Sequence, residues 1–253
     1  MSPFDLRGRV AVVTGGNGGI GLGMALGLAR AGAAVLVVGR NPAKNAQAEA
    51  QLAAVGSNAR ALVLDVTEES AGQAIVDAAL GHFGRLDILV NNVGTNLRKQ
   101  PEAYELAEFR KIMDTNLSSA FICSKAAYGA MRKRGGKMIN IGSMMSLFGA
   151  SFTAPYAASK GAIVQMTKSM ASAWAKDNIQ VNAILPGWIT TDLTLAAVKD
   201  VPALHDKVVQ RTPAGRWGVP SDLAGIAVFL AAPASDFITG AAIPVDGGYS
   251  AQG

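Results

Sequence analysis

Short runs of β-branched and aliphatic residues alternate along this chain with longer segments rich in alanine and leucine. The apolar runs lie at residues 10–15, 34–39, 60–66, 86–92, 136–143, 179–187 and 241–248, and helical segments such as 19–32 and 42–56 lie between them. Continuous apolar strands that alternate with helices are typical of a parallel sheet covered on both faces. The pattern therefore predicts an α/β fold, with a doubly wound parallel sheet of about seven strands.

The composition agrees with one large domain. The chain has 253 residues, of which 50% are hydrophobic and 16% charged, so a large core can be buried. Because no linker or low-complexity tract divides it, we expect a single domain over residues 1–253. The apolar stretches are shorter than the roughly 20 residues that span a bilayer, and the start lacks a secretory signal.

Charge and cysteine content narrow the class of protein. The formal net charge is +5, but the densest basic patches, residues 98–99 and 132–134, have no interleaved aromatic residues. A solvated surface explains them better than a nucleic-acid groove does. The single cysteine, Cys123, excludes an internal disulfide and fits a reducing cytosol. We expect a cytoplasmic protein in which Cys123 is a packed core residue.

A glycine-rich turn, "TGGNGGIG" at residues 14–21, follows the first predicted strand and opens a helix. Glycine permits positive φ and lets a ligand approach the backbone closely. The start of the helix offers free N–H groups and a positive dipole end, which suits a pyrophosphate. A tight turn packed without a ligand is the alternative, but the position after the first strand favours dinucleotide binding.

A second cluster indicates acid–base chemistry. Ser143 closes a predicted strand, and Tyr156 and Lys160 follow on a helix that Pro155 suits in its first turn. Residues four apart share a helical face, and a nearby ammonium favours the phenolate, so we expect Lys160 to lower the pKa of Tyr156. Tyr156 then serves as proton donor and acceptor near neutral pH. By itself such a pair is more often an ordinary helix-surface pair, but the accompanying serine and glycine-rich turn favour the chemical interpretation.

Together these motifs resemble the single-domain short-chain dehydrogenase/reductase family. The matching features are the glycine turn, "NNVG" at 91–94, Asn116, Ser143, Tyr156 with Lys160, and "PGWITT" at 186–191. The resemblance covers nearly the whole chain and implies a Rossmann-like fold and reversible hydride transfer between a nicotinamide cofactor and an alcohol or carbonyl. Val93 departs from the alanine usual in the family, but it is also apolar, so we expect its cofactor contact to survive.

The resemblance also implies roles for single residues. Tyr156 would exchange a proton with the substrate oxygen, Ser143 would hydrogen-bond that oxygen, Lys160 would bind the nicotinamide ribose, and Asn116 would hold a water molecule. These four form the catalytic set, and no metal ligand is assigned. The cofactor-binding set is Thr14, Gly15, Asn17, Gly19, Ile20, Gly21, Arg40, Asn41, Asp65, Val66, Asn91, Gly94, Tyr156, Lys160, Pro186, Gly187, Ile189 and Thr191.

The end of the second strand, "VVGRN", indicates the cofactor. Sites for NAD usually carry an acid there for the ribose 2′-hydroxyl, whereas this chain has Gly39 and Arg40. Arg40 can bind a 2′-phosphate, and we expect Gly39 to leave room for it. We therefore predict NADP, with NAD possible because Arg40 can also be a solvated turn residue.

The substrate is less determined. The segments 95–100, 144–150 and 188–211 shape the pocket in this family, and the last is long enough for a helical lid. Strings such as "INIGSMMSLFG" resemble sugar-acid dehydrogenases of the gluconate 5-dehydrogenase and deoxy-ketogluconate dehydrogenase kind. That resemblance makes Arg98 a candidate for a substrate carboxylate, unless it is a solvated loop cation. Met144, Met145 and Trp188 either line the pocket or pack in the core.

Three functions remain open: a dehydrogenase or carbonyl reductase for a small-molecule sugar acid, a 3-oxoacyl-thioester reductase, and a non-catalytic nucleotide-binding scaffold. The presence of Ser143, Tyr156 and Lys160 disfavours the last. The family also implies a homotetramer assembled through the helical regions 106–133 and 154–176. Fold alone fixes neither the substrate and its stereochemistry nor the direction of the reaction.

Overall fold

Seven parallel strands form the central sheet in a computed structural model that describes residues 2–201 and 203–252. In chain order they are β1 (Val10–Thr14), β2 (Ala34–Gly39), β3 (Ala59–Val63), β4 (Ile88–Asn91), β5 (Gly136–Ile141), β6 (Ile179–Pro186) and β7 (Ala242–Val245). Their order in the sheet is β3-β2-β1-β4-β5-β6-β7. The chain reverses its direction of winding between β1 and β4, where ligands bind in such sheets. The predicted doubly wound parallel sheet is confirmed.

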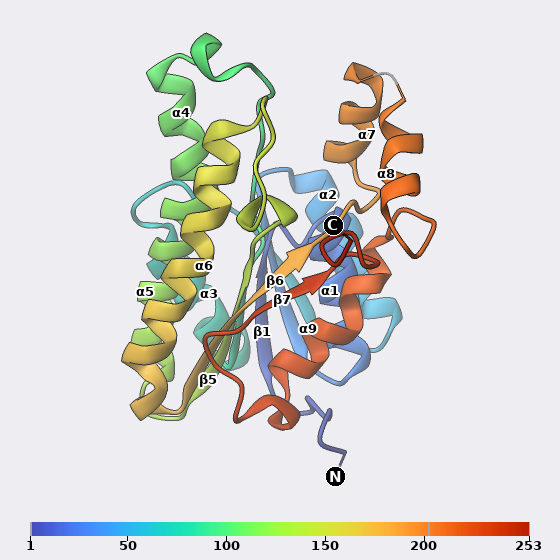
Figure 1. Cartoon of the computed structure of the whole chain (residues 1–253). Coiled ribbons are helices and arrows are strands. Elements are labelled where there is room, and N and C mark those ends of the chain that lie inside the picture. Colours follow the sequence, from blue (N-terminus) through green and yellow to red (C-terminus); the bar gives the residue numbers. More distant parts are fainter. Residues whose placement is uncertain (1, 202, 253) are drawn as a thin grey trace.

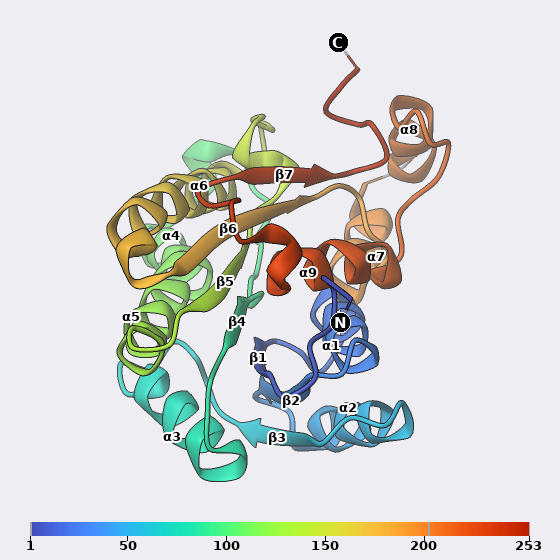
Figure 2. The same ribbon diagram turned by 90° about the horizontal axis from the view of Figure 1, so that it is seen from below.

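Helices cover both faces of this sheet. On one face lie α1 (Gly19–Arg30), α2 (Pro42–Ala54) and α9 (Ala224–Ala231), and on the other lie α3 (Ala71–Phe83), α5 (Ser119–Met131) and α6 (Ala154–Trp174) (Figures 1 and 2). Helix α4 (Leu106–Met113) precedes α5. Among the described residues, no helix is long and apolar enough to cross a membrane.

Two helices, α7 (Asp192–Asp200) and α8 (Leu204–Arg211), lie beyond the carboxyl ends of the strands (Figure 1). They occupy the segment 188–211 that the sequence predicts as a helical lid, of which residue 202 lies outside the described residues. A capping box begins α7, because the Thr191 and Thr194 side chains bond to each other's backbone amides. The segment is therefore helical, as expected.

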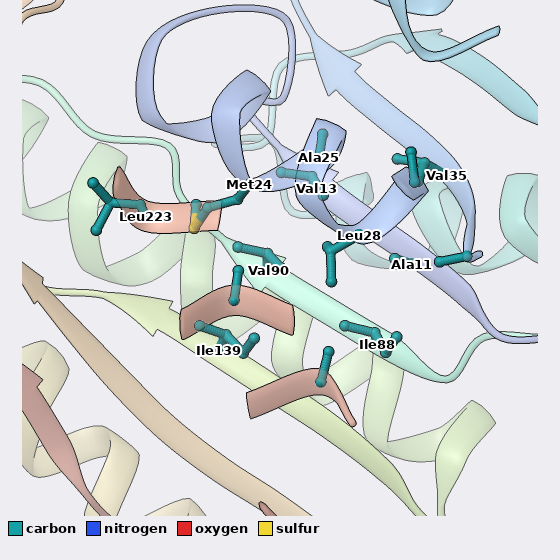
Figure 3. Close-up of a cluster of buried hydrophobic side chains, with 14 of the residues drawn as sticks. Ala11, Val13, Met24, Ala25, Leu28, Val35, Ile88, Val90, Ile139 and Leu223 are labelled. Atoms are coloured by element: carbon teal, nitrogen blue, oxygen red, sulfur yellow. The ribbon is translucent and has the colours of Figure 1, made fainter. Parts of the chain in front are cut away.

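Alternate strand residues supply two cores. Ala11 and Val13 on β1 pack with Val35 against α1 and α9, as Figure 3 shows, while Val12 points to the opposite face. Strands buried on both faces explain the unbroken apolar runs in the sequence. Cys123 lies in the second core, where burial raises the pKa of its thiol to about 12, so it is the packed residue that we expected.

Several strands end earlier than the apolar runs suggest. Strand β5 ends at Ile141 and β3 at Val63, so Ser143 and Asp65 lie in the loops that follow. The expectation that Ser143 closes a strand is wrong in this detail. Its side chain caps a short 3-10 turn, Met144–Ser146, by accepting a hydrogen bond from the Met145 amide at 3.1 Å.

Candidate active site

The glycine-rich turn lies at the reversal point of the sheet. Gly15 and Gly19 have φ of 62° and 50°, in the left-handed region that favours glycine. The Thr14 hydroxyl ties the turn to β4 by accepting a hydrogen bond from the Asn92 amide at 3.0 Å. Gly18 is the N-cap of α1, and a Cβ built there has no described atom within 4 Å. An anion can therefore approach the free N–H groups of the helix.

Two cavities run from this turn along the carboxyl edge of the sheet. The larger, of about 1150 Å³, extends over the ends of β2 and β3 to Arg40 and Asp65. The smaller, of about 290 Å³, extends over the ends of β5 and β6 to Tyr156. Both are lined by Asn17 and Gly94. An extended, two-ended ligand such as a dinucleotide fits this arrangement.

Most residues of the expected cofactor set line these cavities. The larger is lined by Gly15, Asn17, Arg40, Asp65, Val66 and Gly94, and the smaller by Asn17, Gly19, Ile20, Gly94, Tyr156, Lys160, Pro186, Gly187, Ile189 and Thr191. Val93 also lines the larger cavity.

Four members of the set support the site from outside the cavities. Thr14 anchors the turn, and Gly21 packs beneath it, where a Cβ would overlap the Gly15 carbonyl. Asn41 caps α2 by accepting a hydrogen bond from the Lys44 amide at 3.0 Å. The Asn91 side chain points into the core, where its amide donates to Ser124 and Asn140.

Ser143 and Tyr156 lie together at the inner end of the smaller cavity. Ser143 is fixed from two sides, because its backbone amide donates to the Ser146 hydroxyl at 3.2 Å, and that hydroxyl donates to the Lys160 carbonyl at 2.7 Å. Burial raises the pKa of Tyr156, while the Ser143 hydroxyl and the Arg98 guanidinium act in the opposite direction.

Lys160 is buried beside the same cavity. Its Nζ donates to the Ile141 carbonyl at 2.7 Å and lies 5.8 Å from the centre of the Tyr156 ring. Burial lowers the pKa of the ammonium to about 8. The expectation that Lys160 lowers the pKa of Tyr156 is therefore not met in this structure: desolvation dominates both groups, and the charge that favours the phenolate is that of Arg98.

Asn116 lies in a π-helical turn, Asp114–Ser118, between α4 and α5. Its Oδ1 accepts a hydrogen bond from the Thr95 amide at 2.7 Å, and its Nδ2 donates to the Thr95 carbonyl at 3.0 Å. Nδ2 also donates to the Ser159 hydroxyl at 2.9 Å. Asn116 thus joins the loop after β4 to helix α6 next to Lys160.

A third cavity, of about 110 Å³, adjoins the reacting groups. It is lined by the three expected substrate residues, Arg98, Met145 and Trp188, together with Ser143 and Tyr156. Met144 also lines it, although it is almost fully buried in a small core cluster. The residues assigned to the substrate from the sequence are thus brought together at one end of the cleft.

The end of β2 packs closely against the glycine-rich turn. A Cβ at Gly39 would overlap the Asn17 carboxamide and lie 2.9 Å from Asn45 Oδ1. Asn17 thus occupies the space that a side chain at residue 39 would take, and Gly39 itself lines the larger cavity beside Arg40. Arg40 extends outward and forms an ion pair with Asp65 at 3.3 Å. The pKa of Asp65 is lowered, chiefly by the hydrogen bond from the Thr67 amide.

Sequence reasoning missed some lining residues. Asn92 lines both the larger and the smaller cavity, and its Nδ2 donates to the carbonyls of Thr14 and Gly15. Its position in the motif "NNVG" was the sequence signal that could have identified it. Arg110 and Lys111 line the larger cavity from α4. No motif in the sequence marks these two residues, since their approach to the sheet edge is a tertiary feature.

Comparisons with known proteins agree with this geometry. The family model described as enoyl-(acyl carrier protein) reductase matches residues 15–250. The chain is 42% identical to 2-dehydro-3-deoxy-D-gluconate 5-dehydrogenase of Escherichia coli, covering 100% of this chain and 99% of the relative. It is 40% identical to gluconate 5-dehydrogenase of Gluconobacter oxydans, with coverage of 98% and 96%. A gluconate 5-dehydrogenase from Burkholderia cenocepacia, solved in complex with NADP and tartrate, superimposes with a TM-score of 0.94 at 41% identity and covers 99% and 98% of the two chains.

Proposed function

The chain belongs to the short-chain dehydrogenase/reductase family, and we propose that it interconverts a secondary alcohol and a ketone on a sugar acid, or a similar polar carbonyl compound, with NADP(H). It is an NAD(P)-dependent oxidoreductase that acts on CH–OH groups. The observation that carries the substrate class is the cavity in which Arg98 shares a wall with Ser143 and Tyr156.

Tyr156 is the proposed acid and base. In ketone reduction its hydroxyl donates a proton to the substrate oxygen, and in alcohol oxidation the phenolate accepts it. Ser143 accepts a hydrogen bond from the Met145 amide, and its O–H, which lies beside the Tyr156 phenol, can donate to the substrate oxygen. Both groups lie on rigid supports, which fixes the substrate oxygen between them.

Lys160 and Asn116 support this chemistry. The Lys160 ammonium sits where Gly94 allows close approach, since a Cβ on Gly94 would be only 3.3 Å from Nζ. We propose that Lys160 binds the ribose hydroxyls of the cofactor. Asn116 is proposed to position the loop after β4 and to hold a water molecule beside Lys160.

The cleft fits a nicotinamide dinucleotide, which supplies hydride transfer when bound. The uncapped start of α1 would bind its diphosphate, and Arg40 would bind the 2′-phosphate of NADP by exchanging its partner Asp65 for the more highly charged group. The relative from Burkholderia cenocepacia that was solved with NADP supports this assignment.

Arg98 is proposed to bind the substrate carboxylate. Its guanidinium is close enough to Tyr156 to oppose the effect of burial on the phenol pKa, so an anion paired with Arg98 lies within reach of the reacting groups. The curated relatives named for gluconate derivatives support an acidic substrate.

The test is oxidation of NADPH across a panel of keto sugar acids, acetoacetyl thioesters and plain ketones. We expect the highest kcat/KM with a keto sugar acid and at least about a tenfold loss for that substrate in Arg98→Ala, because a charge-assisted hydrogen bond contributes roughly 1.5–3 kcal/mol. Arg134→Ala, which removes an exposed cation distant in sequence, is the control. A preference for the thioester would favour the 3-oxoacyl-thioester reductase instead.

Three further proposals concern the whole protein. Residues 1–253 form one folding unit, in agreement with a family match over residues 15–250. The chain assembles as a homotetramer, for which the exposed apolar side chains of Leu106, Phe109 and Phe121 provide a surface. The protein works in the cytoplasm, as its single buried cysteine suggests.

A further inference from the structure

The wall of the 110 Å³ cavity contains a polar group that the proposed chemistry does not use. Asn96 lines this cavity together with Ser143 and Tyr156. Its Oδ1 atom is buried and has no hydrogen-bond partner among the described residues. Buried polar atoms are almost always paired, so an unpaired one beside reacting groups requires an explanation.

The backbone on both sides of Asn96 is held in place. The Thr95 amide and carbonyl both bond to Asn116, at 2.7 and 3.0 Å. On the other side, the Lys99 amide donates to the Phe152 carbonyl at 3.2 Å. These hydrogen bonds hold the backbone at Asn96 and thereby fix the position of its Cα–Cβ bond. A residue that recognises a ligand needs this kind of preorganised support.

The chemistry of the wall indicates the ligand. A carboxamide oxygen accepts hydrogen bonds, so its partner must carry a donor. Arg98, two residues further along the same wall, disfavours a cationic donor. An uncharged donor is therefore required, and in a polyol or the ketone formed from it that donor is a hydroxyl group. Since the carboxamide also carries two N–H donors, it can bind two adjacent oxygens at once.

We propose that Asn96 is a specificity-determining residue that binds a substrate hydroxyl next to the reacting carbon, with Oδ1 as the acceptor. This inference rests on the proposed carbonyl–alcohol chemistry of the site. Oδ1 is buried in this structure, so the carboxamide must rotate about χ2 when the substrate binds. This torsion has a broad energy minimum in asparagine. Oδ1 has no protein hydrogen bond that this rotation would break.

A selectivity between related ketones follows. A ketone with an adjacent hydroxyl satisfies Oδ1, whereas the same ketone without it leaves the oxygen unpaired. Sites built to hydrogen-bond a substrate hydroxyl reject the analogue that lacks it more strongly than a purely apolar pocket does. Acyl thioesters with a 3-oxo group and no adjacent hydroxyl fall in the rejected class.

The experiment measures kcat/KM for matched ketones with and without the adjacent hydroxyl, built around the carbonyl substrate that the parent enzyme reduces fastest. Asn96→Leu keeps the side-chain size and removes the amide. Leu97→Ala, at an exposed neighbour in the same loop, controls for disturbance of the loop. We expect the parent and Leu97→Ala to prefer the hydroxylated ketone by about tenfold or more, and Asn96→Leu to reduce this preference to within about twofold.

An Asn96→Leu variant that loses activity equally on both ketones would show a structural role and overturn the proposal, as would an unchanged preference. If the sugar-acid assignment is wrong, the parent enzyme will not reduce keto sugar acids, and this result is independent of the Asn96 comparison. The comparison of hydroxylated and plain ketones still decides the role of Asn96 in that case.

Discussion

At the scale of single residues, burial governs the chemistry of this site more than sequence spacing does. The four-residue spacing of Tyr156 and Lys160 correctly places both beside one cavity. It cannot show that desolvation raises the pKa of the phenol and lowers that of the ammonium, or that Arg98 lies near the phenol. Those effects depend on which loops close over the side chains.

Removing the Tyr156 hydroxyl tests the proton transfer. Tyr156→Phe keeps the ring and removes the exchangeable proton, so kcat should fall by at least about a hundredfold, the usual scale for a general acid–base group. NADP binding, measured by fluorescence titration, should stay within about twofold of the parent. Turnover close to that of the parent would exclude Tyr156 from this role.

Lys160 should leave a signature in stability. Its pKa of about 8 in the folded protein lies below its ordinary value of 10.5, so between these pH values the unfolded chain binds more protons. The contribution of Lys160 to the free energy of unfolding therefore rises with pH in this window, by at most about 1.4 kcal/mol per pH unit. It is constant only well below pH 8, at about pH 7 and lower, where Lys160 is protonated in both states.

Urea unfolding from pH 7 to 10 measures this contribution. The parent should gain stability relative to Lys160→Met as the pH rises from 8 to 10. Lys168→Met, which changes an exposed lysine on the same helix, should run parallel to the parent. A difference between parent and Lys160→Met that stays constant with pH would contradict the buried ammonium.

We expect Arg40 to set the preference for NADP over NAD. Arg40→Ala should reduce kcat/KM for NADP by about ten- to a hundredfold, because charge-assisted hydrogen bonds contribute roughly 1.5–3 kcal/mol, and should leave NAD nearly unchanged. Arg60→Ala, on the neighbouring strand, is the control. Equal decreases in kcat/KM for NADP and NAD would show that Arg40 is a solvated turn residue that does not bind the 2′-phosphate. Gly39→Asp is unsuitable here, since its side chain would collide with Asn17.

At the scale of elements, the hydrophobic periodicity of the sequence predicts the strands and most helices, but it misses local departures from regular α-helix. The region 106–133 reads as continuous helix, whereas the structure interrupts it with the π-helical turn Asp114–Ser118. Such turns are rare and frequently occur at functional sites. The widened turn holds Asn116 where it reaches Thr95 and Ser159, and these tertiary partners are not visible in the helical pattern.

Asn116→Leu tests what this turn does. The variant leaves the partly buried Thr95 amide and carbonyl without their partner, so the free energy of unfolding should fall by about 1–3 kcal/mol. Because the loop after Thr95 carries Arg98, KM for an acidic substrate should rise more than KM for a neutral ketone. Denaturant unfolding and steady-state kinetics measure the two effects. A variant as stable as the parent would show that the turn is held by other contacts.

At the scale of the whole molecule, the layers of the fold could be predicted because they follow from the alternation of apolar strands and helices along the chain. Unbroken apolar runs such as Val10–Thr14 require cover on both faces, and the helices between them supply it. The lengths of the strands and the contents of the substrate cavity could not be predicted in this way. Loops distant in sequence meet there, as the contact between Lys99 and Phe152 shows.

The surface of α4 and α5 leads to the last prediction. Leu106 on α4 and Phe121 on α5 expose 60% and 49% of their area, and exposed apolar surface of this kind is what a subunit contact buries. We expect light scattering at micromolar concentration to give four times the 26.0 kDa mass of one chain. Phe121→Glu should shift this mass downward by placing a charge in the contact, whereas Val63→Glu, at an exposed position on the edge strand β3, should not. A monomer mass for the parent would refute the tetramer, and a Phe121→Glu variant with the full mass would place the contact elsewhere on the molecule.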